Sequence, residues 1–308
     1  MDIKQLEYFV HVAELNSFTR ASVVLNVAQP ALSRQVRLLE VELRQSLLIR
    51  NGRGVTTTEA GKLLLEHGRG LLHQFANAKE ELARLRGAAG SNIALGVPPS
   101  LSRILIVPLI RQFRTALPGT VLSVREGLSA AMQESLLNGR LDAALLYELP
   151  GNAMASGVEI TEVCEEELFL IELRGNSNVT APVTLEELAQ TPLVIPSRPN
   201  AMRMKVETRL TDVGLVPTIA LEIDSVSSLL DLVADGAGSA VLPLNALLNS
   251  THADRLVARP VAPPGLRMRL ALAVSSHRPL TRSYQSMLDV ILQTTRAILH
   301  GSGSVVQS

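Results

Sequence analysis

The sequence predicts a multidomain α plus α/β protein, in which a small helical region is followed by one long helix and a larger α/β region. Three observations predict this fold class: short amphipathic helices in the first sixty residues, a proline-free stretch over 58–85, and apolar strands that alternate with helices from residue 93 onward. At 308 residues, 46% of them hydrophobic, the chain is long enough to form two or three domains with their own cores.

Three short helices are expected at the amino end. The first carries Phe9, and the second carries Phe18 and has Ser17 in position to cap it. The third begins near Pro30, because a proline suits the first helical turn, where its missing N–H would have no partner. Four apolar side chains of the third helix fall within one arc that must face the other two helices. These are Leu32, Val36, Leu39 and Leu43.

The opposite arc of the third helix is basic. It carries Arg34, Arg37 and Arg44 with no acidic residue at its centre, so it suits a groove lined by phosphates. The segment RNGRGVTTTEAG follows, and its two glycines permit a tight turn around Arg53. Three helices and a basic turn describe a winged helix-turn-helix. The plain alternative is that Arg34 and Arg37 form only a solvated helix face.

The amino-terminal segments resemble those of the LysR-type transcriptional regulators. The stretches that carry this resemblance are LEYFVHVAELNSFTRAS, VAQPALSRQVRLLE and RGVTTTEAG. Within the family, LLIR and RGVTTTEAGK are similar to the nitrogen-assimilation-control regulators. The resemblance covers nearly the whole chain and implies that the third helix enters the major groove of double-stranded DNA. The DNA-binding residues it implies are Gln29, Pro30, Ser33, Arg34 and Arg37 on the helix, with Arg50 and Arg53 in the wing.

Two positions depart from the usual pattern of that family. Arg44 stands where most members have a glycine after the third helix, and Leu47–Leu48 replaces a Leu-Phe pair before the wing. We expect the fold to tolerate both changes, because a helix can end without glycine at a small cost and leucine fills most of the volume of phenylalanine.

One long helix is expected from Thr58 to Leu85, with Thr57 or Thr58 as its cap. Apolar and small residues within it are spaced alternately by four and three, which is the a/d spacing of a coiled coil. This spacing predicts a homodimer whose two DNA-binding domains read an inverted-repeat operator, and we expect either this dimer or a pair of dimers, a homotetramer, to bind there. The alternative is a helix packed on its own core. The expected dimer contacts are Leu64, Leu71, Phe75, Leu82 and Leu85.

Strands and helices alternate from Ile93 onward, which predicts an α/β region with mainly parallel strands. Two stretches, Glu126–Leu146 and Glu222–Pro243, share one plan: an acidic strand end, a serine cap, a helix, a glycine stop and an apolar strand. This repeat indicates two similar lobes with a cleft between them.

These elements divide the chain into three predicted parts: a DNA-binding domain at 1–58, a linker helix at 59–90 and an effector-binding region at 91–308. The family resemblance implies that the third part is similar to periplasmic binding proteins and holds a small inducer between its lobes. Lobe I would comprise 91–163 and 267–308, and lobe II 164–266. The alternative is an inducer-independent regulator whose lobes serve only for oligomerisation.

The candidate ligand residues are those that follow strands, because ligands of open α/β sheets bind beyond the carboxyl ends of strands. Each serine among them is individually better explained as a helix cap. Together with Arg198 and Arg203 they favour a small anion such as a carboxylate, although Arg198 pointing to solvent is the equal alternative. The candidates are Ser100, Ser102, Ser129, Pro196, Ser197, Arg198 and Ser225.

The sequence offers little support for an enzyme. The nearest histidines, His67 and His73, do not share a helix face, so neither a metal site nor a cofactor is expected. We find no P-loop and no nucleophile elbow.

Composition and the terminal segments limit the remaining classes. The 29 basic residues balance the 29 acidic ones, so a nucleic-acid partner must be argued from where charges lie. The amino terminus does not read as a signal peptide and no apolar run could span a bilayer, so we expect a cytoplasmic protein with no membrane partner. The single cysteine, Cys164, agrees with a reducing compartment. RNA polymerase is a further candidate partner of such a regulator.

Overall fold

The computed structural model describes residues 1–51, 54–84, 91–148, 156–175, 181–276 and 281–303. The chain divides into two units, one formed by Met1–Ser91 with Asn138–Arg140 and the other by Asn92–Leu137 with Leu141–Ser308. Within the described part of the chain, no helix has the length and apolar character needed to cross a bilayer.

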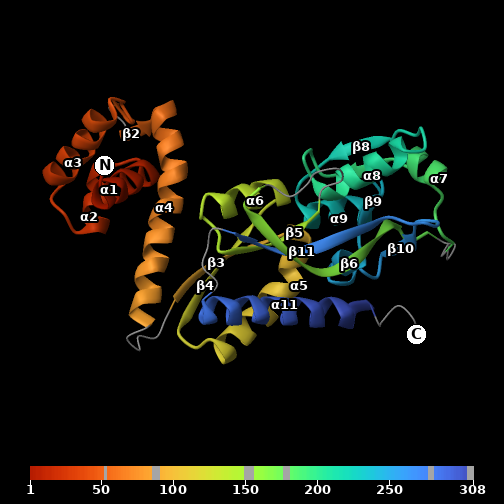
Figure 1. Cartoon of the computed structure of the whole chain (residues 1–308). Helices are drawn as coiled ribbons and strands as arrows, with labels where there is room; N and C mark the ends of the chain where they lie inside the picture. The colour runs from red at the N-terminus through yellow and green to blue at the C-terminus, as the bar shows by residue number, and fades with distance from the viewer. Residues whose placement is uncertain (52–53, 85–90, 149–155, 176–180, 277–280, 304–308) are drawn as a thin grey trace. The chain divides into compact units, whose positions relative to one another are not determined.

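The first unit begins with three helices and a two-stranded antiparallel sheet, as Figure 1 shows in red and orange. Ser17 caps the second helix as predicted, since its side chain accepts a hydrogen bond from the backbone N–H of Arg20. Leu32, Val36 and Leu39 are buried, while Leu43 is half-buried at the edge of the same core. This is a winged helix-turn-helix. Its elements are α1 (Ile3–Leu15), α2 (Phe18–Leu25), α3 (Gln29–Leu43), β1 (Leu48–Asn51) and β2 (Gly54–Thr57).

The fold accommodates both departures from the family pattern. Arg44 ends α3 in the left-handed backbone conformation, with φ of 51°, and its N–H bonds to the carbonyl oxygens of Glu40 and Val41. An arginine pays about 1–2 kcal/mol for a conformation that glycine adopts freely. Leu47 is buried in the core, and Leu48, which stands where the family has phenylalanine, packs against the same core.

The long helix α4 (Glu59–Arg84) begins as predicted, because the Thr58 hydroxyl accepts a hydrogen bond of 3.0 Å from the Gly61 N–H. Its first turns pack on α1, where a Cβ added to Gly68 would lie 3.0 Å from Leu6 Cδ1. Leu64 is half-buried and packs against the core of this unit, as the alternative reading of the helix expects. Leu85 lies outside the described residues.

The second unit is built around a seven-stranded sheet of order β10-β6-β11-β5-β3-β4, with β9 paired to β6. The prediction of mainly parallel strands is wrong here: β11 runs antiparallel to both β5 and β6, and β6 runs antiparallel to β9 and β10. The strands are β3 (Ser91–Val97), β4 (Thr120–Glu126), β5 (Ala143–Tyr147), β6 (Val158–Leu173), β9 (Ala240–Pro243), β10 (Leu256–Pro260) and β11 (Arg267–Ser275).

The long strand β6 explains this reversal, because it crosses from one lobe to the other. Its first part, from Val158 to Glu167, pairs with β11, and its last part, from Phe169 to Leu173, pairs with β10. Figure 1 shows the green β6 beside the blue β11 along this crossing. A second, two-stranded parallel sheet is formed by β7 (Leu193–Ile195) and β8 (Ile219–Glu222).

Helices connect these strands in the predicted strand–helix–strand order, and α6 and α9 occupy equivalent places in the repeated stretches. The carboxyl-terminal α11 packs on α5. The helices of this unit are α5 (Pro99–Ala116), α6 (Ser129–Leu137), α7 (Leu185–Gln190), α8 (Ala201–Thr211), α9 (Val226–Ala234), α10 (Leu244–Leu248) and α11 (Arg282–Gly303).

Candidate nucleic-acid interface and ligand pocket

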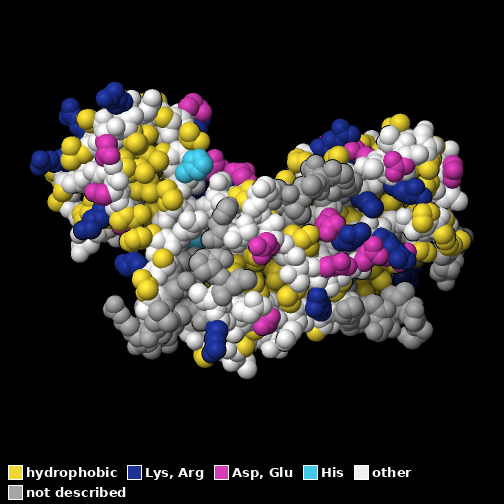
Figure 2. Space-filling view, viewed as in Figure 1, with side chains coloured by type: hydrophobic (Ala, Val, Ile, Leu, Met, Phe, Trp, Pro, Cys, Tyr) yellow, Lys and Arg dark blue, Asp and Glu magenta, His cyan; other side chains and the backbone are white. Residues whose placement is uncertain are grey.

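The amino-terminal half of α3 exposes the predicted basic face. Gln29, Pro30, Arg34 and Arg37 are all exposed, and no side-chain cap bonds the first turn of the helix. Unpaired backbone N–H groups at a helix start favour a negatively charged partner. Figure 2 shows Lys and Arg side chains along the outer edge of this unit. The surface therefore has the charge and shape expected of a helix that meets a phosphate backbone.

Both acidic residues of α3 are held away from this face by other bonds. The Glu40 carboxylate accepts hydrogen bonds from the N–H groups of Leu47 and Leu48, at 2.8 and 3.1 Å. Glu42 forms an ion pair with the amino terminus at Met1. Both carboxylates are thus bonded to other groups of the protein near the carboxyl end of α3. The arginines at its other end are left as the dominant charges there.

The basic face does not extend along the whole helix. Toward its carboxyl end the same side carries Leu38 and Val41, which are 44% and 65% exposed. The exposed arginines of this face thus lie in two places, Arg34 and Arg37 in the first part of α3 and Arg44 at its carboxyl end.

Two predicted DNA contacts are bonded to each other. The Arg50 Nη2 donates a hydrogen bond of 2.8 Å to the Ser33 Oγ, which joins β1 to α3. The Arg50 guanidinium carbon also lies 4.4 Å from the ring centroid of Phe18. Arg53, the other wing residue of the prediction, lies outside the described residues.

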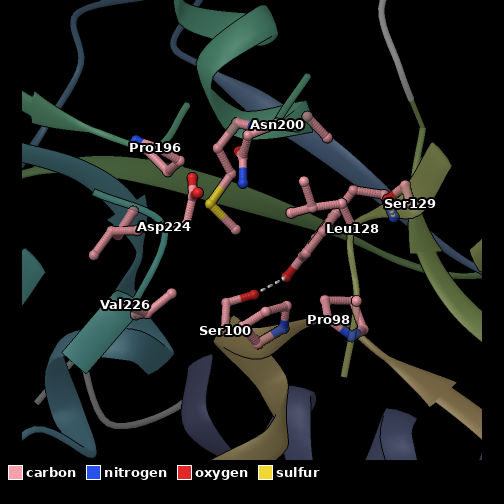
Figure 3. Close-up of a pocket in the computed structure, with 14 residues that line it drawn as sticks. Pro98, Ser100, Leu128, Ser129, Pro196, Asn200, Asp224 and Val226 are labelled. Carbon is pink, nitrogen blue, oxygen red and sulfur yellow. Dashed lines mark hydrogen bonds between the residues drawn. The ribbon is translucent and has the colours of Figure 1, made fainter. Parts of the chain in front are cut away.

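The second unit contains a pocket that is open to solvent and lined by residues of both lobes (Figure 3). The starts of α5, α6, α8 and α9 surround it, and Tyr147 and Leu242 line it from strands β5 and β9. The predicted ligand residues Ser100, Ser129 and Pro196 line the pocket.

A buried hydrogen-bond network lies behind one wall of the pocket. The Tyr147 hydroxyl donates to Glu166 Oε2 at 2.6 Å, and the Asn245 amide donates to Glu166 Oε1 at 3.1 Å. The Ser100 hydroxyl donates to the Tyr147 oxygen at 3.4 Å, as Figure 3 shows by a dashed line, and the Tyr147 N–H donates to Ser129 Oγ at 3.1 Å. One carboxyl on the crossing strand thus holds groups from two other elements, β5 and α10.

Comparison with known proteins places this geometry in a family. The description "Bacterial regulatory helix-turn-helix protein, lysR family" matches residues 3–62, and "LysR substrate binding domain" matches residues 86–296. The chain belongs to the LysR family of bacterial regulators.

Individual LysR-family relatives cover almost the whole chain. The "Nitrogen assimilation regulatory protein nac" of Escherichia coli (strain K12) is 32% identical over 293 residues, which is 95% of this chain and 94% of the relative. Among solved structures, "CbnR, a LysR family transcriptional regulator" has a TM-score of 0.71 at 22% identity and covers 96% of this chain and 99% of its own. "Full-length BenM" has a TM-score of 0.57 at 28% identity, over 95% and 96% of the two chains.

Three of the predicted ligand serines in this LysR-family chain, Ser102, Ser197 and Ser225, are not among the residues that line the pocket. Ser102 Oγ donates to the Pro99 carbonyl at 3.2 Å, and the Ser197 N–H donates to Asp224 Oδ1 at 2.9 Å. Ser225 Oγ accepts from the Ser228 N–H and caps α9. Ser102 and Ser225 therefore make the local hydrogen bonds that serines commonly make at helix starts.

The two arginines that were expected near the ligand of this LysR-family chain, Arg198 and Arg203, form ion pairs with glutamates. Arg198 and Arg203 both pair with Glu207, at 2.9 and 2.8 Å, and Arg203 pairs further with Glu222 at 2.8 Å. Burial alone would raise the pKa of Glu207, but the hydrogen bonds from the two arginines outweigh it and lower that pKa. Neither arginine is among the residues that line the pocket, where Asp224 contributes a carboxylate. The two arginines that the sequence placed near the ligand residues are thus paired with carboxylates outside the pocket lining.

The network behind the pocket was missed from the sequence, although strand periodicity offered a signal. Glu166 lies in the run EVCEEELFL, where it looks like one more surface acid. It shares the inward face of β6 with Leu168 and Leu170, while its neighbours Glu165 and Glu167 point outward. The alternation of the buried leucines marks Glu166 as an inward position.

Burial changes the acid–base chemistry of this network. It raises the pKa of Glu166 despite the hydrogen bonds from Tyr147 and Asn245, and it raises the pKa of Tyr147 well above its usual range, with the Glu166 charge adding to the effect. Burial, with Glu166 nearby, also raises the pKa of the Cys164 thiol to about 12. Tyr147 therefore remains a protonated donor and Cys164 a weakly reactive thiol. Among the described residues, no group of three or more His, Cys, Asp or Glu side chains is placed to hold a metal ion.

Proposed function

We propose that this LysR-family chain is a sequence-specific DNA-binding transcriptional regulator whose helix α3 enters the major groove of an inverted-repeat operator. The observation that carries the proposal is the separation of charges on α3. Arg34 and Arg37 are exposed at its start, while Glu40 and Glu42 are bonded elsewhere. An arginine that reads a guanine edge contributes about 1–3 kcal/mol of discrimination between bases.

A dimer is the form that we propose binds the operator. Leu71, Phe75 and Leu82 are 45%, 46% and 61% exposed along α4, at the spacing of a coiled-coil seam. Association through these three side chains would relate two DNA-binding domains by one two-fold axis. Further association into a tetramer, and contact with RNA polymerase, belong to the same proposal.

The pocket supports control of this regulator by a small molecule. The starts of α5 and α6 carry partial positive charge and lie beside the hydroxyls of Ser100 and Ser129, so they favour a carboxylate there. The Asp224 carboxylate on another wall favours a hydrogen-bond donor. We therefore propose a small carboxylate that also carries a hydroxyl or amino group. The basis is the helix starts rather than the arginines.

We propose a regulatory rather than an enzymatic activity, since the chain's relatives are regulators. We also propose that the protein acts in the cytoplasm, because bacterial DNA lies there.

A footprint on duplex DNA selected by the protein from a random-sequence library tests operator binding. Two protected half-sites related by inversion are expected, and uniform, weak protection would contradict the proposal. A thermal-shift screen of amino acids, hydroxy acids and dicarboxylates tests the pocket. A ligand at a hundredfold excess over its dissociation constant stabilises the native state by about 2.7 kcal/mol. If none of these compounds raises the unfolding temperature, the result would favour the alternative in which the lobes serve only for oligomerisation.

A further inference from the structure

Arg50 occupies a place where the wing, the recognition helix and the second helix meet. It lies on β1, opposite Val55 of β2. Its Nη2 donates to Ser33 Oγ at 2.8 Å, and its guanidinium lies 4.4 Å from the ring centroid of Phe18. Phe18 is only 7% exposed, so the surface that supports the guanidinium is fixed by the core.

The bond from Arg50 limits what Ser33 can offer to DNA. A serine hydroxyl has one proton to donate and lone pairs that accept. A cationic donor placed on one lone pair turns the hydroxyl proton away from itself, so that proton is available to an acceptor on the DNA. Held in this way, Ser33 suits an acceptor such as a phosphate oxygen, guanine N7 or thymine O4.

We propose that Arg50 is a positioning residue that acts through Ser33: it ties the wing to α3 and makes the Ser33 hydroxyl a directed donor toward the operator. The inference rests on the proposed DNA-binding function and names a task for one residue within it. It differs from a phosphate contact, because a phosphate contact supports binding to any duplex, whereas the positioning of Ser33 acts on the selected sequence. Positioning needs the planar fork, which bonds to Ser33 while the guanidinium carbon lies over the Phe18 ring.

Substitution by lysine keeps the charge and loses the fork, and a comparison of two duplexes then separates the two roles, because loss of a phosphate contact weakens binding to both. The probes are a duplex selected by the wild-type protein from a random-sequence library and a scrambled duplex of the same composition. Arg50→Lys, Ser33→Ala and the double variant are compared by fluorescence anisotropy. We expect each single variant to lose roughly tenfold in affinity for the selected duplex, with affinity for the scrambled one nearly unchanged.

The double variant gives the decisive measurement. If Arg50 acts through Ser33, the double variant binds the selected duplex no more weakly than either single variant. Losses that multiply, or an Arg50→Lys variant that binds like the wild type, would overturn the inference. Arg20→Lys is the matched control, since Arg20 is an exposed arginine of α2 in the same unit, and it should leave both affinities unchanged. Circular dichroism and thermal unfolding check that every variant is folded.

Failure of the inference and failure of the proposed function give different results. A wild-type protein that does not distinguish the selected from the scrambled duplex removes the proposed function. A wild-type protein that distinguishes them, together with an Arg50→Lys variant that does so equally well, removes only the role assigned to Arg50.

Discussion

The hydroxyl of Tyr147 donates a hydrogen bond of 2.6 Å to the buried carboxyl of Glu166. Tyr147 lines the pocket from β5, and Glu166 lies on β6, the strand that crosses between the lobes. Asn245 of α10 donates to the same carboxyl. A ligand that meets Tyr147 therefore contacts a network that reaches across the crossing strand, which gives the pocket a direct physical link to the packing of the lobes.

The raised pKa of Glu166 predicts a stability that falls as pH rises. The folded protein keeps a proton on Glu166 at pH values where the unfolded chain has released it, so the stabilisation is complete below the unfolded pKa and is lost as pH rises through the folded one. Glu166→Gln removes this loss. We expect the stability of the variant relative to the wild type to increase with pH, by up to about 1.4 kcal/mol per pH unit within that window. Urea unfolding from pH 4 to 8 measures it, and a constant difference between the two proteins would contradict the prediction.

Ser129 is predicted to be structural as well as pocket-lining. Its hydroxyl oxygen accepts from the buried N–H of Tyr147, so Ser129→Ala leaves that N–H without its acceptor. A loss of about 1–3 kcal/mol in the free energy of unfolding is expected. Ser102→Ala is the control, because Ser102 bonds only to a carbonyl of its own first turn and should cost much less. Equal losses for the two variants would show that the Tyr147 N–H does not depend on Ser129.

Arg34→Ala is expected to weaken binding to the selected duplex by about 1–3 kcal/mol if Arg34 reads a base edge. Binding to a scrambled duplex would then change little. Fluorescence anisotropy on both duplexes measures the two affinities. An equal loss on both assigns Arg34 to a phosphate, and no loss on either removes it from the interface.

Replacing both Leu71 and Leu82 by lysine should break the proposed dimer, because it places charges along the exposed seam of α4. Sedimentation velocity should show a smaller species, and the footprint should shrink to a half-site. Leu63→Lys is the matched control: Leu63 is 60% exposed on α4 but lies about 80° away around the helix from Leu71. A double variant that sediments like the wild type would place the dimer interface elsewhere.

The sequence by itself determined the elements whose causes are local. The arc of Leu32, Val36 and Leu39 fixed which side of α3 is buried, and Ser17 and Thr58 marked two helix starts. Repeated spacing and caps depend on residues within a few positions of each other, so they can be read along the chain.

Only the tertiary structure decided which polar groups meet, because those partners are distant in sequence. Glu166 bonds to Tyr147 and Asn245, 19 and 79 residues away, and Arg203 pairs with Glu222 across two elements. The sequence could place Arg198 and Arg203 near the pocket, but it could not show that Glu207 occupies both. The partner of a charge is set by the packing of whole elements, and the spacing of its neighbours along the chain does not record that packing.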